Sequence, residues 1–380
     1  SGVTSATPVR GTVALTPSMV SPYITWEKVD NANLGLDLML FDNRLSLEAN
    51  IYQRMTRDMI GPAEAIPDIS GIASENRSKI NNATLRNRGW ELSVNWHDQL
   101  KCGFSYGVGF NVFSYKAVVT KYNNPDGTIY NNHTGYGPNK GYYEGMDLGE
   151  IWGYQADDLF MTNREIDDYL RKVDMSALKP DDMWRRGDLK YIDSNNDGKI
   201  DDQHDMKAMG NPKTPELQFG IPLGLSYKGW DLSVLFQGAA LTSLQLSGPA
   251  VWDFPVMGAQ GNNMGKVKAM HLDSWTPDNP DASYPALHLG NHPNNKNASS
   301  SLFLYDASYL RLKNIEIGYS LPQKLIQKAH LQQVRFYVQG MNLLTFDKLG
   351  DVNMDPETGN GNGSWYPIQR IYNFGVNVTF

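Results

Sequence analysis

The chain has 380 residues, of which 41% are hydrophobic, 11% aromatic and 20% charged, and its formal net charge is −7 at pH 7. Lysine and arginine are scattered rather than clustered, so no basic face is available for phosphate contacts and nucleic acid is excluded as an expected partner. The single cysteine, Cys102, excludes an internal disulfide framework. No window approaches about 18 consecutive apolar residues, which excludes a transmembrane helix but leaves a membrane β-barrel open.

Nine segments have the composition of β-strands, and four of them alternate apolar and polar residues with the strand period of two. The nine are residues 34–41, 44–52, 89–97, 103–119, 217–227, 230–237, 308–321, 334–343 and 371–380. The clearest alternation places Trp90, Leu92, Val94 and Trp96 on one face of residues 89–97. Within residues 308–321 the parity slips, because Leu312 and Ile315 cannot share a face in a regular strand, and this slip predicts a β-bulge.

Short and long connections alternate strictly between these nine segments. Because transmembrane barrels have short periplasmic turns and long extracellular loops, this order predicts an all-β fold of about nine antiparallel strands that span a membrane. The largest excursion, residues 120–216, is then an extracellular loop region. It contains a short strand at residues 151–160 and a helix that begins at a capping box, Thr162 to Glu165. Nine lipid-embedded strands leave two unpaired edges, so we expect further strands outside this chain.

Blocks of sequence in a fixed order resemble the C-terminal half of SusC/RagA-type TonB-linked outer-membrane transporters. The blocks include NRGWELSVNW, GEIWGYQADDLF, GDLKYIDSNNDGKIDD, GNPKTPELQFGIPLGLSYKGWDLSVLFQG, SYLRLKNIEIGYSLP, VRFYVQGMNLLTF and the terminal phenylalanine. Any one block is weak, but the shared order makes the resemblance specific. It covers most of the chain.

The resemblance implies a barrel of about 22 strands that is closed by an N-terminal plug and energised through the TonB complex. It also implies a SusD-like lipoprotein that sits on the barrel as a hinged lid, and import of oligosaccharides or peptides across the outer membrane. On this interpretation, residues 1–380 are the C-terminal part of the barrel, and the plug and the first strands lie outside the chain.

The sharpest local motif is a candidate calcium loop. Its expected ligands stand at alternate positions of an EF-hand-type loop, with Gly198 at the sharp turn; they are Asp193, Asn195, Asp197, Lys199 through its carbonyl, and Asp201. His204 stands where the twelfth position needs an acidic ligand, and Asp202 or Asp205 could supply the missing carboxylate. The alternative is a surface turn that binds no ion tightly.

No catalytic constellation is present. The seven histidines contain no HExxH motif and no paired spacing, so a catalytic metal centre is not expected, and no GxSxG, P-loop or GxGxxG motif occurs. By strand parity, Glu48, Glu91, Asp231 and Arg335 face the lumen, where they are expected to solvate it or to contact the plug. The rival interpretations are a passive outer-membrane porin, which lacks plug and lid, and a soluble calcium-stabilised β-sheet binding protein. An enzyme is not expected.

Overall fold

The computed structural model describes residues 20–61, 78–123, 142–180, 183–202, 204–254, 256–257, 262–263, 267–289, 292–352, 354–358, 361–363 and 365–380. Nine of its strands form one sheet. They are β1 (Lys28–Leu40), β2 (Leu45–Gly61), β3 (Ile80–Gln99), β4 (Ser105–Lys121), β9 (Leu217–Tyr227), β10 (Trp230–Ala240), β15 (Tyr309–Ser320), β16 (Gln333–Asp347) and β17 (Ile371–Thr379). Within the described ranges, no helix has the length and apolar character needed to cross a membrane.

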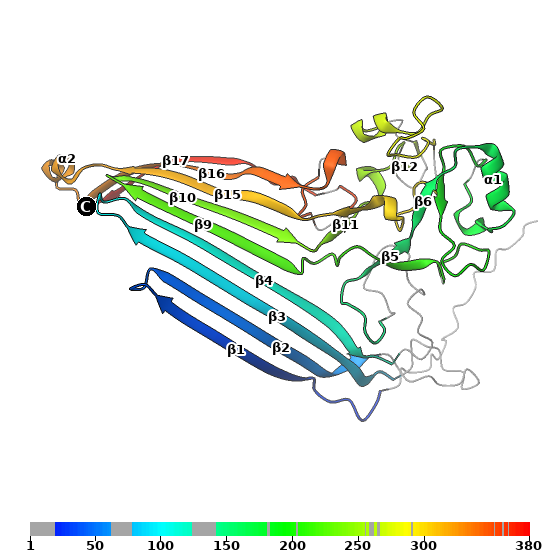
Figure 1. Cartoon of the computed structure of the whole chain (residues 1–380), viewed down its shortest axis with the longest axis horizontal. Helices are drawn as coiled ribbons and strands as arrows, with labels where there is room; N and C mark the ends of the chain where they lie inside the picture. Colours follow the sequence, from blue (N-terminus) through cyan, green and yellow to red (C-terminus); the bar gives the residue numbers. More distant parts are fainter. Residues whose placement is uncertain are drawn as a thin grey trace, which may run out of the picture.

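The nine strands lie side by side in the order β1-β2-β3-β4-β9-β10-β15-β16-β17, and every neighbouring pair is antiparallel. Figure 1 shows the short turns and the C-terminus gathered at one end of the sheet, while the long connections gather at the other end. The predicted number of strands and the predicted sorting of the connections are therefore confirmed. At the short-turn end, residues 322–333 contain the brief helix α2 (Gln323–Ile326) and a following turn, η7 (Gln327–Ala329).

The register gives the sheet one apolar face and one polar face. On the apolar face, for example, cross-strand pairs join Leu232 to Ile317, Ile317 to Val338, and Val338 to Phe374. Ile317, Val338 and Phe374 are exposed, Phe374 to 77%, so the apolar face is not packed inside a two-sheet sandwich. The polar face carries the alternate residues of the same strands.

The predicted bulge lies at Lys313. On β15, Leu312 pairs with Phe236 of β10 and Asn314 with the preceding Leu235, so Lys313 has no partner on β10. This extra residue returns Ile315 to the face that Leu312 occupies, which explains the slip of parity in the sequence.

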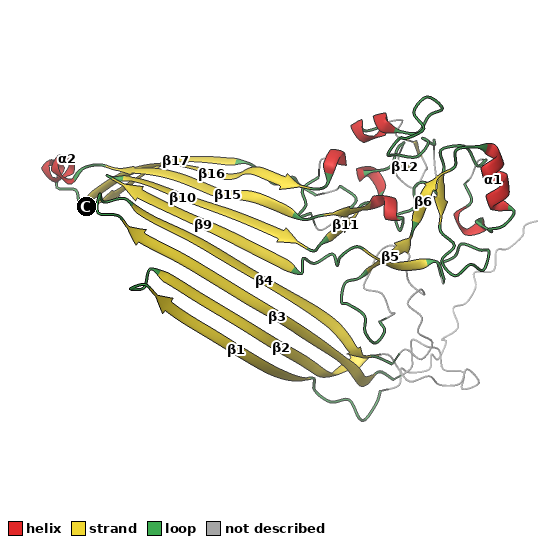
Figure 2. Ribbon diagram, in the orientation of Figure 1, coloured by secondary structure: helices red, strands yellow, loops and turns green. Residues whose placement is uncertain are grey.

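The described parts of three long connections, residues 142–216, 241–308 and 348–363, fold together into what we call the loop body. Figure 2 shows that the helical segments, other than α2 and the adjoining η7, belong to this end of the molecule. Its short elements are β5 (Ile151–Tyr154), β6 (Ala156–Leu159), α1 (Asn163–Leu170), η3 (Ser176–Leu178), β7 (Leu189–Tyr191), β8 (Met206–Met209), β11 (Ser243–Gln245), η4 (Gly248–Ala250), β12 (Val256–Met257), β13 (Asn262–Asn263), η5 (Ala269–Asp273), η6 (Ser301–Phe303), β14 (Leu304–Asp306) and η8 (Gly350–Val352).

Two apolar cores hold the loop body together. In the first, Trp275 from the second connection packs with Tyr191 and Ile200 from the first. In the second, Leu349 from the third connection packs with Phe303 and other residues of the second. Because each core draws on two connections, the three connections form one folded unit rather than separate loops.

The predicted helix is confirmed as α1, and Thr162 is its N-cap. Thr162 Oγ1 accepts a hydrogen bond from the Glu165 backbone N–H at 3.1 Å. The Glu165 carboxylate in turn accepts the Met161 N–H at 3.0 Å. Ile166 buries the apolar side of the helix. Strands β5 and β6 occupy the predicted segment 151–160, and both lie outside the nine-stranded sheet.

Candidate functional site

The predicted calcium loop lies in the loop body as a tight turn. Asp193 Oδ2 accepts the Gly198 N–H at 2.8 Å, and Asp197 Oδ1 accepts the Lys199 N–H at 2.9 Å. Gly198 has a φ of 81°, which is the left-handed conformation that the sharp turn requires of a glycine. The backbone then continues into Ile200, which is fully buried and anchors the turn to the first core.

The carboxylates of this turn are partly engaged with neighbours. Asn195 Nδ2 donates to Asp197 Oδ2 at 2.8 Å, and Lys199 Nζ pairs with Asp201 Oδ2 at 3.1 Å. One buried oxygen, Asp193 Oδ1, has no hydrogen-bond partner among the residues that the structure describes. The residues thus contain a suitable set of oxygen ligands, and calcium at this turn stays a prediction.

Asp205, which the sequence offered only as an alternative carboxylate ligand, closes the turn through two hydrogen bonds. Its two carboxylate oxygens accept the N–H groups of Ser194, at 2.7 Å, and Asp201, at 2.8 Å. Burial, together with the nearby carboxylates of Asp193 and Asp201, raises the pKa of Asp205. A cation beside this cluster would offset that repulsion.

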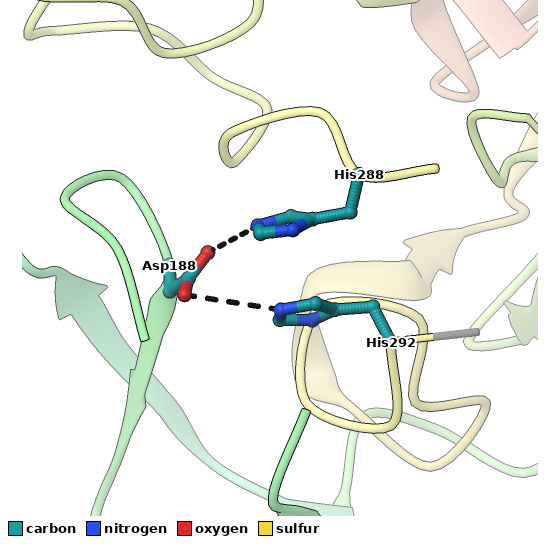
Figure 3. A group of neighbouring side chains, drawn as sticks. All are labelled: Asp188, His288 and His292. Carbon is teal, nitrogen blue, oxygen red and sulfur yellow. Dashed lines mark hydrogen bonds and ion pairs between the residues drawn. The ribbon is translucent and has the colours of Figure 1, made fainter. Parts of the chain in front are cut away.

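A second cluster in the loop body was not predicted. Figure 3 shows the imidazole rings of His288 and His292 directed at the carboxylate of Asp188. His288 Nε2 lies 2.6 Å from Asp188 Oδ1, and His292 Nε2 lies 3.8 Å from Asp188 Oδ2. All three side chains are at most 1% exposed. Among the described residues, this is the group of three acidic or histidine side chains whose ligand atoms lie within 4.8 Å of one another.

Two histidines and an aspartate are a common donor set for transition metals, but the hydrogen bonds around His292 oppose that use. His292 Nδ1 accepts the Asn295 N–H at 3.1 Å. A neutral imidazole with an accepting Nδ1 carries its proton on Nε2, the atom that faces Asp188. Nε2 therefore carries a hydrogen and has no lone pair for a metal, although its separation of 3.8 Å from Asp188 Oδ2 is too long for a hydrogen bond.

The aspartate also joins distant segments of the loop body. Asp188 accepts hydrogen bonds from the Arg185 N–H at 2.8 Å and from Asn295 Nδ2 at 3.0 Å. Asn295 Oδ1 accepts the Leu189 N–H, so one side-chain amide fixes the segment around residue 295 both to Asp188 and to the first residue of β7. We interpret the cluster as a buried structural link. No paired histidine spacing was recognised in the sequence, but His288 and His292 are four residues apart, and this spacing could have indicated the cluster.

The residues assigned to the lumen by parity lie on the polar face. Glu48 pairs with Ser93 of β3, and Glu91 pairs with Asn50 of β2. Arg335 makes two contacts with Asp231, at 3.0 Å and 2.5 Å, and one with Glu316 at 2.6 Å. Three adjacent strands, β10, β15 and β16, are thus joined by one charged cluster on this face.

Comparison with known proteins gives a consistent result. The family model described as TonB dependent receptor-like, beta-barrel, matches residues 4–343. TonB-dependent receptor P3 of Formosa agariphila is 28% identical over 372 residues, which cover 94% of this chain and 34% of that protein. TonB-dependent receptor SusC of Bacteroides thetaiotaomicron is 23% identical over 368 residues, which cover 96% of this chain and 33% of that protein.

The fold agrees with a solved transporter. The structure of the RagAB peptide importer in its open-open state superposes with a TM-score of 0.69 at 24% identity, covering 96% of this chain and 36% of that chain. The chain therefore spans about a third of the length of the relatives it matches. The predicted resemblance to SusC/RagA-type transporters is confirmed. This chain belongs to the TonB-dependent receptor family, whose members are outer-membrane transport proteins, and it forms part of the transmembrane β-barrel.

Proposed function

We propose that the protein to which this chain belongs imports oligosaccharides or peptides across the outer membrane in a TonB-dependent manner, with a SusD-like surface lipoprotein. The observation that carries the proposal is the loop body. Three long connections share two apolar cores at a single end of the sheet, whereas simple barrel loops need no common core. A folded unit of this kind offers a partner a preformed surface.

The proposal places the loop body at the cell exterior, because the long connections of outer-membrane barrels are extracellular. The solved RagAB structure is that of a peptide importer, which supports peptides as one substrate class. SusC relatives of this chain support the wider family assignment without naming a substrate. On the polar face, the Arg335 cluster lies within the proposed lumen, where we assign it to solvation of the channel or contact with the plug.

Growth of a deletion strain on a panel of oligosaccharides and peptides tests the function. We expect loss of growth on one substrate class, and the same loss when TonB is deleted while the transporter is kept. Uptake that persists without TonB would favour the passive porin. Growth on every substrate by the transporter deletion strain would refute the proposed import.

Exposed apolar side chains on the loop body support the proposed lipoprotein partner. Leu272 and Leu289 are 84% and 71% exposed, and Met183 is 80% exposed. Large apolar side chains left in water at a folded surface are typical of contact sites for another protein. We propose that they contact the lid.

Co-purification tests this contact. In the full-length protein, Leu272→Asp with Leu289→Asp should reduce recovery of the lipoprotein at least about tenfold, because charges would be buried at the interface. The matched control is Leu325→Asp in α2, which is also exposed, to 62%, but lies at the short-turn end. Equal recovery with both variants would contradict the proposed contact.

We further propose that calcium binds at Asp193, Asn195, Asp197, the Lys199 carbonyl and Asp201, and stabilises the turn without chemistry. Asp193 Oδ1 supports this, because it is buried and has no hydrogen-bond partner in the described ranges. Calcium at millimolar concentration should raise the protease resistance of the loop body, and Asp193→Ala should abolish the effect. Magnesium serves as the control ion. The same protection in Asp193→Ala would leave the motif as a surface turn.

A further inference from the structure

Two arginines lie on the apolar face toward the loop body. Ile51 of β2 and Trp90 of β3 are cross-strand partners at the loop-body end of the continuous apolar stripe on these two strands. The next pair toward the loop body is Gln53 with Arg88, and Arg86 follows on the same face two residues further along β3. This position is where a lipid-facing surface passes from hydrocarbon to head groups.

The charge of these arginines is not balanced. Arg88 stands directly opposite Lys116 of β4, and like charges in that position repel. Lys116 pairs with Asp147 at 2.6 Å. Neither Arg86 nor Arg88 has a carboxylate partner in the part of the chain that the structure describes, and Arg88 Nε donates to the neutral Gln53 Oε1 at 2.6 Å. An anion is therefore the missing complement.

An apolar groove begins beside Arg88. It is shallow, with a volume of about 500 Å³. The side chains of Leu34 and Ile51, which are 69% and 57% exposed, line it toward the hydrocarbon, and Gln53 and Arg88 line its opposite end. The groove is thus apolar along its length and cationic at one end, which is the polarity of a lipid with an anionic head group.

We propose that Arg86 and Arg88 bind the phosphate of an outer-leaflet lipid whose acyl chain lies in the groove over Leu34 and Ile51. The planar guanidinium group matches phosphate oxygens through paired hydrogen bonds. The groove is continuous with the lipid-facing surface, and this favours a membrane lipid over soluble phosphate as the ligand. The leaflet follows from the proposed orientation of the barrel, while the binding itself is independent of import.

The test uses the full-length protein in nanodiscs that contain lipid A, with bound lipid measured by native mass spectrometry. Arg88→Gln should weaken lipid A binding at least about tenfold, since one charge-assisted contact is lost, and Arg86→Gln with Arg88→Gln should remove the bound lipid. The matched control is Arg54→Gln. Like Arg88, Arg54 is exposed, but it lies on β2 opposite Asn87 and on the polar face of the sheet. Binding of lipid A to Arg54→Gln should therefore be unchanged.

A second variant guards against misfolding. Gln53→Glu keeps both arginines and places a carboxylate beside Arg88, so it should weaken binding in the same direction. Dephosphorylated lipid A should bind the unmodified protein as weakly as lipid A binds the double variant Arg86→Gln with Arg88→Gln. Undiminished lipid in the double variant, equal binding of the dephosphorylated lipid, or displacement by millimolar inorganic phosphate would overturn the proposal. Import assays do not enter this test, so its failure would leave the proposed transport intact.

Discussion

Arg311 connects the last long connection to the sheet, and its replacement by methionine is the sharpest perturbation that the structure suggests. Its guanidinium is 1% exposed and pairs with Asp355 at 2.6 Å and Glu357 at 3.0 Å. Nε also donates to Thr345 Oγ1 at 3.0 Å. Arg311→Met leaves two carboxylates without their cation, which destabilises far more than the pair itself stabilises.

We expect the free energy of local opening of residues 348–352 to fall by about 2–3 kcal/mol. Breaking a fully buried pair costs more, about 3–5 kcal/mol. The smaller value reflects the partial exposure of Asp355 and Glu357, at 18% and 27%. Hydrogen exchange of this segment in the full-length protein should then accelerate about 30- to 150-fold.

Lys348→Met is the matched control for this experiment. Lys348 pairs with Asp306 at 2.8 Å, but the two side chains are 68% and 40% exposed. An exposed pair contributes at most about 1 kcal/mol, so exchange should change less than about fivefold. Equal acceleration in both variants would refute the assignment of Arg311 as the anchor of the last connection.

Two further predictions concern the faces of the sheet and the acid response of the loop body. Leu92→Arg on the apolar face should destabilise the full-length barrel in lipid by about 2–4 kcal/mol, whereas Ser93→Arg on the polar face should cost under about 1 kcal/mol; equal urea midpoints would contradict the two faces. His271 Nδ1 accepts the Lys268 N–H at 3.0 Å, and burial lowers the pKa of His271 below its usual 6.5. Its contribution to stability is therefore full above pH 6.5 and is lost as the pH falls through the lowered pKa. The loop body of the unmodified protein should resist protease better than that of the His271→Gln variant at about pH 8, and the two should become similar at about pH 5. A difference that stays constant over this pH range would contradict the assigned role of His271.

The membrane part of the fold was predictable because a strand directs alternate side chains to opposite faces, and lipid requires one of those faces to be apolar. Trp90, Leu92, Val94 and Trp96 indicated their face without any knowledge of the neighbouring strands. The ends of the strands were less predictable. Strand β3 begins at Ile80, nine residues before the predicted start at residue 89, because residues beyond the lipid, such as Asn81, are polar on either face and carry no alternation.

The clusters of the loop body were beyond sequence reasoning for a different reason. The calcium motif is local, so its residues could be named, but the role of Asp205 depends on how the turn folds back onto Ser194. The contact between Asp188 and His288 joins residues 100 positions apart. Neither segment has a helical or strand period, so only the closed tertiary structure brings them together.

That separation also has a consequence for the hairpin of β9 and β10. Asp188 belongs to the connection before strand β9, and His288 belongs to the connection after strand β10. The antiparallel pairing of β9 with β10 brings the ends of these two connections to the same end of the sheet, where Leu217 pairs with Ala240. The buried contact between Asp188 and His288, and the packing of Trp275 against Tyr191, therefore join the two connections across the open end of the hairpin.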